Sequence, residues 1–306
     1  MDVRQTWSLR QLRYFMEVAE REHVSEAADH LHVAQSAISR QIANLEEELN
    51  VTLFEREGRN IKLTPIGKEF LIHVKTAMKA IDYAKEQIDE YLDPHRGTVK
   101  IGFPTSLASQ LLPTVISAFK EEYPHVEFLL RQGSYKFLIE AVRNRDIDLA
   151  LLGPVPTNFS DITGKILFTE KIYALVPLNH PLAKQKTVHL IDLRNDQFVL
   201  FPEGFVLREM AIDTCKQAGF APLVSTEGED LDAIKGLVSA GMGVTLLPES
   251  TFAETTPRFT VKIPIEFPQV KRTVGIIKPK NRELAPSAND FYEFVIQFFS
   301  KLEQYQ

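Results

Sequence analysis

The chain has 306 residues, 44% of them hydrophobic and 25% charged, a balance typical of globular proteins with a sizeable buried core. At ~150 residues per domain, this length predicts two or three domains. The net charge of −6 argues against a protein that coats nucleic acid through bulk positive charge. It does not exclude a sequence-reading DNA-binding protein, which needs basic residues only at its contact surface.

The sequence also bears on compartment. No apolar run approaches the ~18 to 20 residues of a membrane-spanning helix, and "MDVRQTWSLRQLRYF" at the start has no apolar core like that of a signal peptide. The single cysteine, Cys215, excludes an internal disulfide and fits a reducing compartment. We therefore expect a cytoplasmic protein without a membrane partner.

Three short helical patterns come first. In the first, apolar residues recur at helical spacing from Leu9 to Ala19. The second is expected to start with Ser25 as its N-cap and to end in a turn at 32–33. The third is expected over 35–49, because its apolar residues repeat every three or four positions. Its predicted core face consists of Ile38, Ile42, Leu45 and Leu49.

A hairpin and a long helix follow. Two short strands are expected at 53–56 and 61–63, with a turn between them. Thr64 and Pro65 predict a helix start, and the pattern continues to about Leu92. A helix of ~27 residues is ~40 Å long. Its apolar stripe needs another helix to cover it, most simply the same helix of a second copy. The stripe consists of Ile66, Phe70, Val74, Met78, Ile81, Ile88 and Leu92.

From Thr98 onward, strand and helix patterns alternate. The segments "TVKIGF", "VEFLLRQG" and "IDLALLG" predict strands separated by helices, which is typical of a parallel sheet with helices on its faces. About 200 residues are many for one open sheet, so we expect two α/β lobes with crossing connections. An aromatic-rich helix is expected over 289–302.

The first helices have the pattern of a helix-turn-helix, whose second helix enters the major groove of DNA. A glutamine can pair with adenine and an arginine with guanine, and a good bidentate pair discriminates between bases by ~1–3 kcal/mol. The alternative is the polar face of a small solvated helical bundle. The predicted reading surface consists of Gln35, Ser36, Ser39 and Arg40. The hairpin after it would meet phosphates or the minor groove through Arg56, Arg59 and Lys62.

A second candidate site lies in the α/β region, where ligands bind beyond the carboxyl ends of strands. Thr105 and Ser106 follow the first strand, and their hydroxyls suit a carboxylate. Arg131 and Gln132 end the second strand. Ser and Thr also cap helices in every class of protein, so a purely structural role stays open.

Several motifs resemble those of the LysR-type transcriptional regulators. "SEAADHLHVAQSAISRQIANLEEELNVTLFER" and "LTPIGKEFL" resemble the family's N-terminal signature, and "IGFPTSLASQLLP", "DIDLALLG" and "AGMGVTLLP" resemble its effector domain in the same order. One position departs from the pattern. Ala34 stands where the family usually has Ser or Thr, and alanine caps a helix poorly, at a cost of ~0.5–2 kcal/mol.

The resemblance implies an α/β protein with an N-terminal winged helix-turn-helix (1–64), a linker and dimerisation helix (65–93) and a two-lobed effector domain like a solute-binding protein (94–306). The first lobe would comprise about 98–168 and 273–306, and the second about 169–272. The residues expected at the effector cleft are Thr105, Ser106, Arg131, Gln132, Gly153, Pro202 and Phe205.

The resemblance also implies a function. The chain is similar to family members that activate glutamate synthase genes, which implies 2-oxoglutarate or glutamate as effector, with no cofactor and no metal. Such a dicarboxylate should need a cation, and the nearest in sequence are Arg131, Lys136 and Arg208. The implied partners are double-stranded promoter DNA, further copies in a homodimer and homotetramer, RNA polymerase and another protein of the regulated pathway.

Two alternative functions are an α/β enzyme and a plain solute-binding protein. An α/β enzyme with a helical accessory domain would need a nucleophile and base, a metal frame or a cofactor loop, and the sequence shows none of these patterns. A plain solute-binding protein would not need the helix-turn-helix. We therefore expect a regulator that is not an enzyme.

Overall fold

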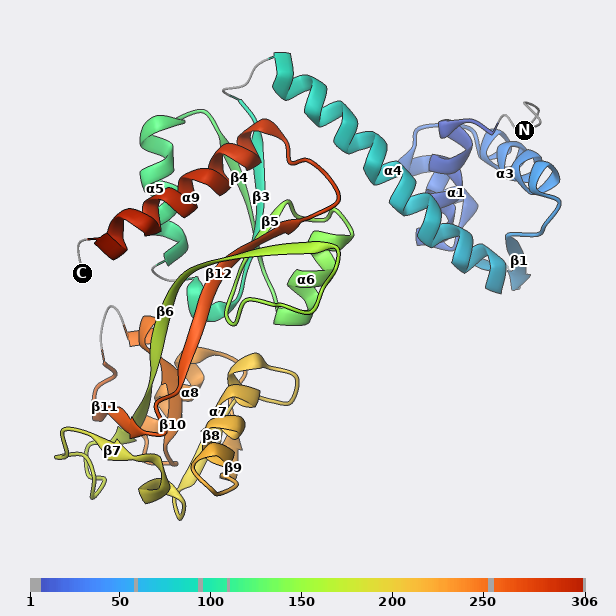
Figure 1. The fold of residues 1–306 in the computed structure, drawn as a ribbon. Helices are drawn as coiled ribbons and strands as arrows, with labels where there is room; N and C mark the ends of the chain where they lie inside the picture. Colours follow the sequence, from blue (N-terminus) through green and yellow to red (C-terminus); the bar gives the residue numbers. More distant parts are fainter. Residues whose placement is uncertain (1–6, 58–59, 93–95, 109–110, 253–255, 305–306) are drawn as a thin grey trace. The chain divides into compact units, whose positions relative to one another are not determined.

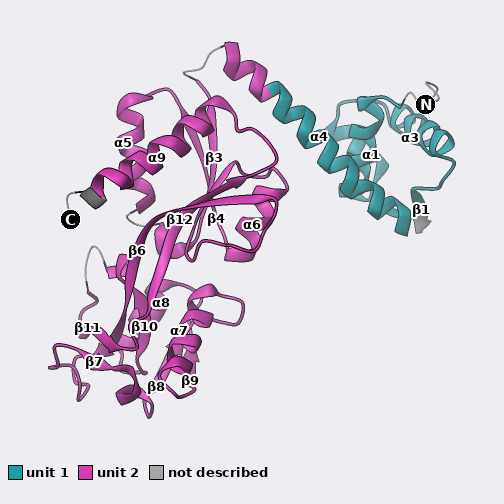
Figure 2. Ribbon diagram, in the orientation of Figure 1, with its two compact units in different colours: residues 1–85 teal, residues 86–306 magenta. Residues whose placement is uncertain are grey.

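The computed structural model is shown in Figure 1, and it divides into two compact units, Met1–Lys85 and Glu86–Gln306 (Figure 2). Of the described helices, none combines the length and apolar character needed to cross a membrane. The residues whose structure is described are 7–57, 60–92, 96–108, 111–252 and 256–304.

The first unit begins with three helices, α1 (Leu9–Arg21), α2 (Val24–His30) and α3 (Gln35–Leu49). The predicted bounds of the third helix are confirmed. Its N-cap is Ala34, which makes no side-chain hydrogen bond to the helix. By contrast, α1 has a side-chain cap, because Ser8 and Gln11 form a reciprocal capping box at its start. The unit's core includes the fully buried Phe15, Ile38 and Leu45.

The start of the second helix corrects one expectation. The N-cap is His23, whose backbone is extended (φ −149°, ψ 115°), and Ser25 already lies inside the helix. The helix begins earlier because Val24 packs against the core, and the amide of Ala27 donates to the carbonyl of His23. The prediction of Ser25 as N-cap is therefore wrong.

Strands β1 (Phe54–Glu57) and β2 (Asn60–Leu63) form the expected antiparallel hairpin. The amide of Ile61 donates to the carbonyl of Glu22 over 3.1 Å, which ties the hairpin to the end of α1. The carboxylate of Glu46 accepts the amides of Leu53 and Phe54 at 2.7 and 3.0 Å. Glu46 therefore holds the start of the hairpin on the end of α3.

Helix α4 runs from Pro65 to Leu92. Thr64 is its N-cap as predicted, because its hydroxyl accepts the amide of Gly67 at 3.0 Å. The stripe of this helix has two parts. Phe70, Val74 and Met78 pack into the core of the first unit, so the expectation that this part needs a second chain is wrong. The exposed members of the stripe are Ile66, Ile81, Ile88 and Leu92.

The first lobe of the second unit contains the expected parallel strands, β3 (Thr98–Phe103), β4 (Glu127–Gln132) and β5 (Leu149–Leu152). Helices α5 (Leu111–Glu122) and α9 (Pro286–Gln304) pack together through Phe119 and Phe291, whose ring centres are 5.1 Å apart. Helix α6 (Tyr135–Arg143) packs against β5.

Two long antiparallel strands, β6 (Ile162–Pro177) and β12 (Lys271–Pro279), connect the two lobes (Figure 1). The first half of β6 pairs with β12, and its second half pairs with β10 (Thr245–Pro248) and β11 (Thr260–Phe267). The sheet is therefore mixed rather than wholly parallel. The expected two lobes with crossing connections are confirmed.

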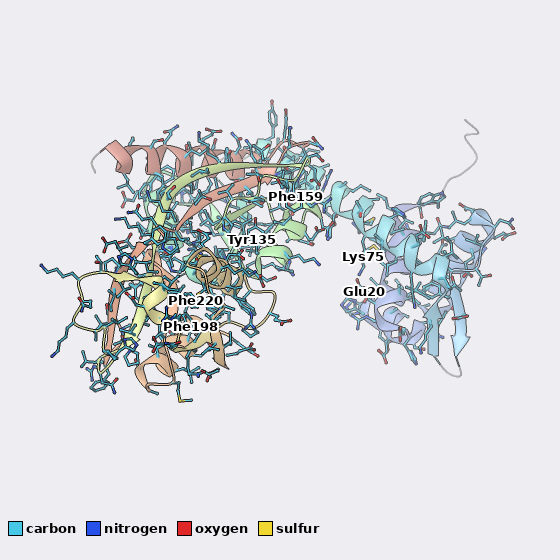
Figure 3. The ribbon with its side chains drawn as sticks, turned by 60° about the horizontal axis from the view of Figure 1, so that its bottom comes forward. Glu20, Lys75, Tyr135, Phe159, Phe198 and Phe220 are labelled. Atoms are coloured by element: carbon cyan, nitrogen blue, oxygen red, sulfur yellow. The ribbon has the colours of Figure 1, made fainter. Side chains whose placement is uncertain are left out.

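The second lobe adds the parallel pair β8 (Gln197–Leu200) and β9 (Leu223–Glu227), the short β7 (Val188–His189), and helices α7 (Val206–Gln217) and α8 (Leu231–Ser239). Phe198 and Phe220 pack in its core with ring centres 6.2 Å apart (Figure 3). Cys215 is buried there, and burial raises the pKa of its thiol to about 12. A thiol with this pKa is inert as a nucleophile near neutral pH.

Candidate functional site

The candidate DNA-reading surface lies on α3. The three buried residues of this helix, Ile38, Ile42 and Leu45, fix which face points to the core. Leu49, predicted as the fourth residue of the core face, is partly buried and packs against the same core. The exposed face of the helix carries all four predicted contact residues, Gln35, Ser36, Ser39 and Arg40.

The predicted wing contacts are only partly covered by the structure. Lys62 lies on β2 and is exposed. Arg56 lies on β1, and its side chain is outside what the structure describes. Arg59 also lies outside the described residues.

An ion pair joins α4 to α1 in the same unit. The ammonium of Lys75 on α4 lies 2.7 Å from the carboxylate of Glu20 on α1 (Figure 3). Both side chains are partly exposed, so the pair contributes at most ~1 kcal/mol to stability. It adds to the apolar contacts that hold α4 on the helical bundle.

The second candidate site is a cavity of about 330 Å³ between the two lobes of the second unit. Four of the residues expected at the cleft come together in its wall: Thr105, Ser106 and Gln132 from the first lobe and Phe205 from the second. Tyr135, the first residue of α6 and labelled in Figure 3, also lines it. The volume is within the range that holds small metabolites.

The hydroxyls of Thr105 and Ser106 already accept hydrogen bonds from other side chains of the protein. The amide nitrogen of Gln132 donates to Thr105 Oγ1 over 2.8 Å. Nη1 of Arg272 donates to Ser106 Oγ over 3.1 Å. A hydroxyl that accepts a hydrogen bond still has its own proton to donate. Both groups can therefore donate to an acceptor in the cavity.

Arg272 itself belongs to a buried ion pair between the crossing strands. Its Nε and Nη2 donate to Glu170 Oε1 over 2.9 and 2.6 Å. The other oxygen of Glu170 accepts the amide of Ser250 at 2.8 Å. Burial lowers the pKa of Arg272, and Glu170 opposes that shift by favouring the charged form. Because an arginine keeps its charge in proteins, the Arg272 guanidinium remains positively charged.

Two helix starts border the cavity from opposite lobes. Ser134, the N-cap of α6, accepts the amide of Phe137, and Val206 and Leu207 form the first turn of α7. The amino end of a helix carries a partial positive charge and favours anions. The acidic Glu229 also lines the cavity and is exposed. The wall thus contains two helix starts that favour an anion and one acidic side chain, Glu229, that favours a cation.

The remaining predicted residues are not among the described residues that line this cavity. Arg131 is exposed and lies over the ring of Phe137 at 5.0 Å. Gly153 packs on Arg272, since a Cβ there would lie 3.1 Å from Arg272 Nε. The carbonyl of Pro202 accepts the amide of Phe205 at 3.3 Å.

The other two candidate cations also have defined surroundings. Arg208 is engaged, because its Nη1 donates to Glu227 and to the carbonyl of Phe201, both over 2.7 Å. Lys136 is exposed on α6. The cation in contact with the cavity wall is Arg272, which donates to Ser106 and which no sequence pattern indicated. An arginine at the start of an apolar strand gives no sign of its partner.

Comparison with known proteins identifies the family. Residues 9–68 match the model described as "Bacterial regulatory helix-turn-helix protein, lysR family", and residues 93–300 match "LysR substrate binding domain". This chain belongs to the LysR family. As a LysR-family member it is a DNA-binding transcriptional regulator with a domain for a small-molecule effector, and it is not an enzyme.

Two relatives are similar in sequence over most of the chain. The HTH-type transcriptional regulator YybE of Bacillus subtilis (strain 168) is 36% identical over 292 residues, covering 95% of this chain and 99% of YybE. The hydrogen peroxide-inducible genes activator of Pectobacterium carotovorum subsp. carotovorum is 29% identical, covering 88% of this chain and 89% of that protein.

A solved structure confirms the architecture. Full-length CbnR in complex with its target DNA superposes with a TM-score of 0.74 at 25% identity, covering 95% of this chain and 99% of CbnR. The N-terminal helix-turn-helix and the two-lobed α/β effector domain of this LysR regulator are therefore the family's fold.

Proposed function

We propose that this LysR regulator activates glutamate synthase genes in response to a small dicarboxylate, 2-oxoglutarate or glutamate, bound in the interlobe cavity. The observation that carries the choice of a carboxylate is the pair of hydroxyls, Thr105 and Ser106. Each accepts a hydrogen bond from a protein donor and keeps its own proton for the ligand. A ligand oxygen that only accepts hydrogen bonds satisfies both.

The charges around the cavity support the same class of ligand. The starts of α6 and α7 favour an anion, whereas Arg272 is largely neutralised by Glu170. Glu229 favours glutamate over 2-oxoglutarate, because the ammonium group of glutamate can pair with a carboxylate. The two ligands therefore differ in a way that an experiment can resolve.

The DNA-binding part of the proposal assigns base contacts to Gln35, Ser36, Ser39 and Arg40, and backbone contacts to Arg56, Arg59 and Lys62. Support comes from the exposed face of α3 and from the CbnR structure, which contains target DNA. The activating role is supported by relatives named as activators. A regulator that binds chromosomal promoters would act in the cytoplasm.

The proposed organisation has three parts: 1–64 reads DNA, 65–93 pairs two chains, and 94–306 binds effector with lobes at about 98–168 plus 273–306 and 169–272. The exposed part of the α4 stripe supports the pairing. We propose that two dimers join into a homotetramer, and that RNA polymerase and another protein of the regulated pathway are further partners.

The effector assignment is tested by thermal unfolding of the full-length protein with 2-oxoglutarate, glutamate or glutamine. We expect a saturable rise in Tm with a dicarboxylate and a weaker one with glutamine. Ser106→Ala should weaken the affinity at least about 10-fold, since hydrogen bonds to charged groups contribute about 1.5–3 kcal/mol. Ser225→Ala, an exposed serine away from the cavity, is the matched control. Equal affinity in Ser106→Ala and the control would exclude this site.

The target assignment needs a separate measurement. A reporter fused to the glutamate synthase promoter should be activated in cells that carry the regulator and not in cells that lack it. Equal expression in both strains would show that the regulator controls other genes.

A further inference from the structure

The last turn of α4 contacts the first lobe through a buried carboxylate. Glu90 is 8% exposed, and its Oε2 accepts the amide and the hydroxyl of Ser287 at 3.1 and 2.9 Å. Its Oε1 accepts the amide of Thr98 at 3.4 Å. One carboxylate thus joins the end of the linker helix to both β3 and α9.

The packing around this carboxylate is tight. A Cβ at Gly97 would lie 2.2 Å from Ser287 Oγ and 2.6 Å from the carboxyl carbon of Glu90, so the backbone passes directly beside the pair. One turn earlier, Glu86 accepts both of its hydrogen bonds from the ammonium of Lys100 on β3, over 2.6 and 2.8 Å. Two successive turns of the helix are therefore fastened to the same strand.

A buried carboxylate strongly favours the geometry in which its hydrogen bonds are made. When its partners move away, the charge is left buried without compensation, which is costly. The end of α4 is therefore held on the first lobe in one favoured orientation.

Strand β3 links this attachment to the candidate effector site. Thr98 and Lys100, which meet the helix, lie in its first half, and Thr105 and Ser106 follow its last residue, Phe103. The strand is hydrogen-bonded on both sides, to β4 and β5. At ~3.3 Å per residue, only about 20 Å separate its two ends.

We propose that Glu90 is the positioning residue through which the effector domain controls the linker helix, so that a change at 105–106 reaches the DNA-binding domain along β3 and α4. This inference rests on the proposed effector site. It assigns the coupling to the hydrogen bonds of Glu90 with Ser287 and Thr98, and not to a general stiffness of the helix.

The attachment itself is tested without ligand by amide hydrogen exchange on the full-length protein. The variants are Glu90→Gln, which keeps the size and removes the charge, and Ser287→Ala, which removes one donor. Asp89→Asn is the matched control, because Asp89 is the exposed neighbour on the same helix. Exchange at the amides of Thr98 and Ser287 should be at least about 10-fold faster in Glu90→Gln than in the control.

The coupling is tested with DNA selected in vitro by the wild-type protein and with 2-oxoglutarate or glutamate as probe. Glu90→Gln should bind the probe within about twofold of wild type by calorimetry. The fold-change in DNA affinity that the probe causes should fall toward one, whereas Asp89→Asn keeps the wild-type response.

The outcomes separate the two proposals. If the probe changes the DNA affinity of Glu90→Gln as much as that of the wild type, the coupling role is overturned. If neither probe binds the wild type, the proposed effector is wrong. The exchange experiment then tests by itself whether Glu90 holds the end of α4 on the first lobe. Unchanged exchange at Thr98 and Ser287 in Glu90→Gln would show that Glu90 does not position the helix.

Discussion

Ser106 combines a structural hydrogen bond with a position in the wall of the candidate site. Its hydroxyl accepts from Arg272, which is buried and paired with Glu170 across the two connecting strands. The guanidinium consequently sets which way the hydroxyl proton can point. A serine held in this way is a fixed donor, whereas a serine at the surface would rotate freely between donor and acceptor roles.

At the same scale, Arg40 is the strongest candidate for base recognition on α3. We expect Arg40→Ala to weaken binding to the selected DNA site by about 1–3 kcal/mol, because an arginine can bind guanine through two hydrogen bonds. Gel-shift titrations against the selected and a scrambled site measure the loss. Glu47→Gln, on the exposed face farther along the helix, should change neither affinity. An unaltered preference in Arg40→Ala would remove this residue from the reading surface.

Among the elements, α4 depends on its first turn and on the core contact of its first half. Thr64 accepts the amide of Gly67 and donates to the carbonyls of Thr52 and Leu53. The cap therefore joins the helix to the segment that enters the hairpin. Farther along, Val74 and Met78 are nearly fully buried in the core of the first unit. These contacts fasten the helix to the DNA-binding unit.

We expect Thr64→Ala to lower the free energy of unfolding of the first unit by about 0.5–2 kcal/mol through loss of the cap. Urea unfolding monitored by circular dichroism measures the change. Thr76→Ala is the matched control. Thr76 lies inside the same helix and donates to the carbonyl of Ile72, and alanine favours helix interiors. Equal stability loss in both variants would argue against a capping role.

At the scale of the whole molecule, the exposed part of the α4 stripe predicts self-association. Ile81 is 39% exposed and Ile88 61% exposed on the helix. Apolar side chains in a row on one helix are typical of a surface that pairs with another helix.

Replacing Ile81 by lysine should shift the protein toward monomers, because a charge would then be buried between two helices. Sedimentation velocity measures the shift, and Asp82→Lys, one position along on the same helix, is the control. A dimer that persists in Ile81→Lys but dissociates in Asp82→Lys would place the interface on another face.

Much of the local structure followed from the sequence. The bounds of α3, the cap of α4 and the parallel strands at the start of the effector domain depend on periodicity and on neighbours within a few positions. Thr105 and Ser106 lie in the cavity wall, as expected for residues beyond the carboxyl end of a strand. Gln132 and Phe205, which were expected there from the family resemblance, line the same cavity. The start of α2 was missed, because core packing of Val24 outweighed the capping preference of Ser25.

The sequence by itself determined which segments are helices and strands and which helix presents a polar face, since those features depend on residues a few positions apart. Only the tertiary structure decided which distant groups meet. Arg272 binds Glu170 across 102 positions and Ser106 across 166, and Ser287 binds Glu90 across 197. These contacts depend on how the strands cross and how the last helix packs. A charged residue carries no local sign of the partner that folding will bring to it.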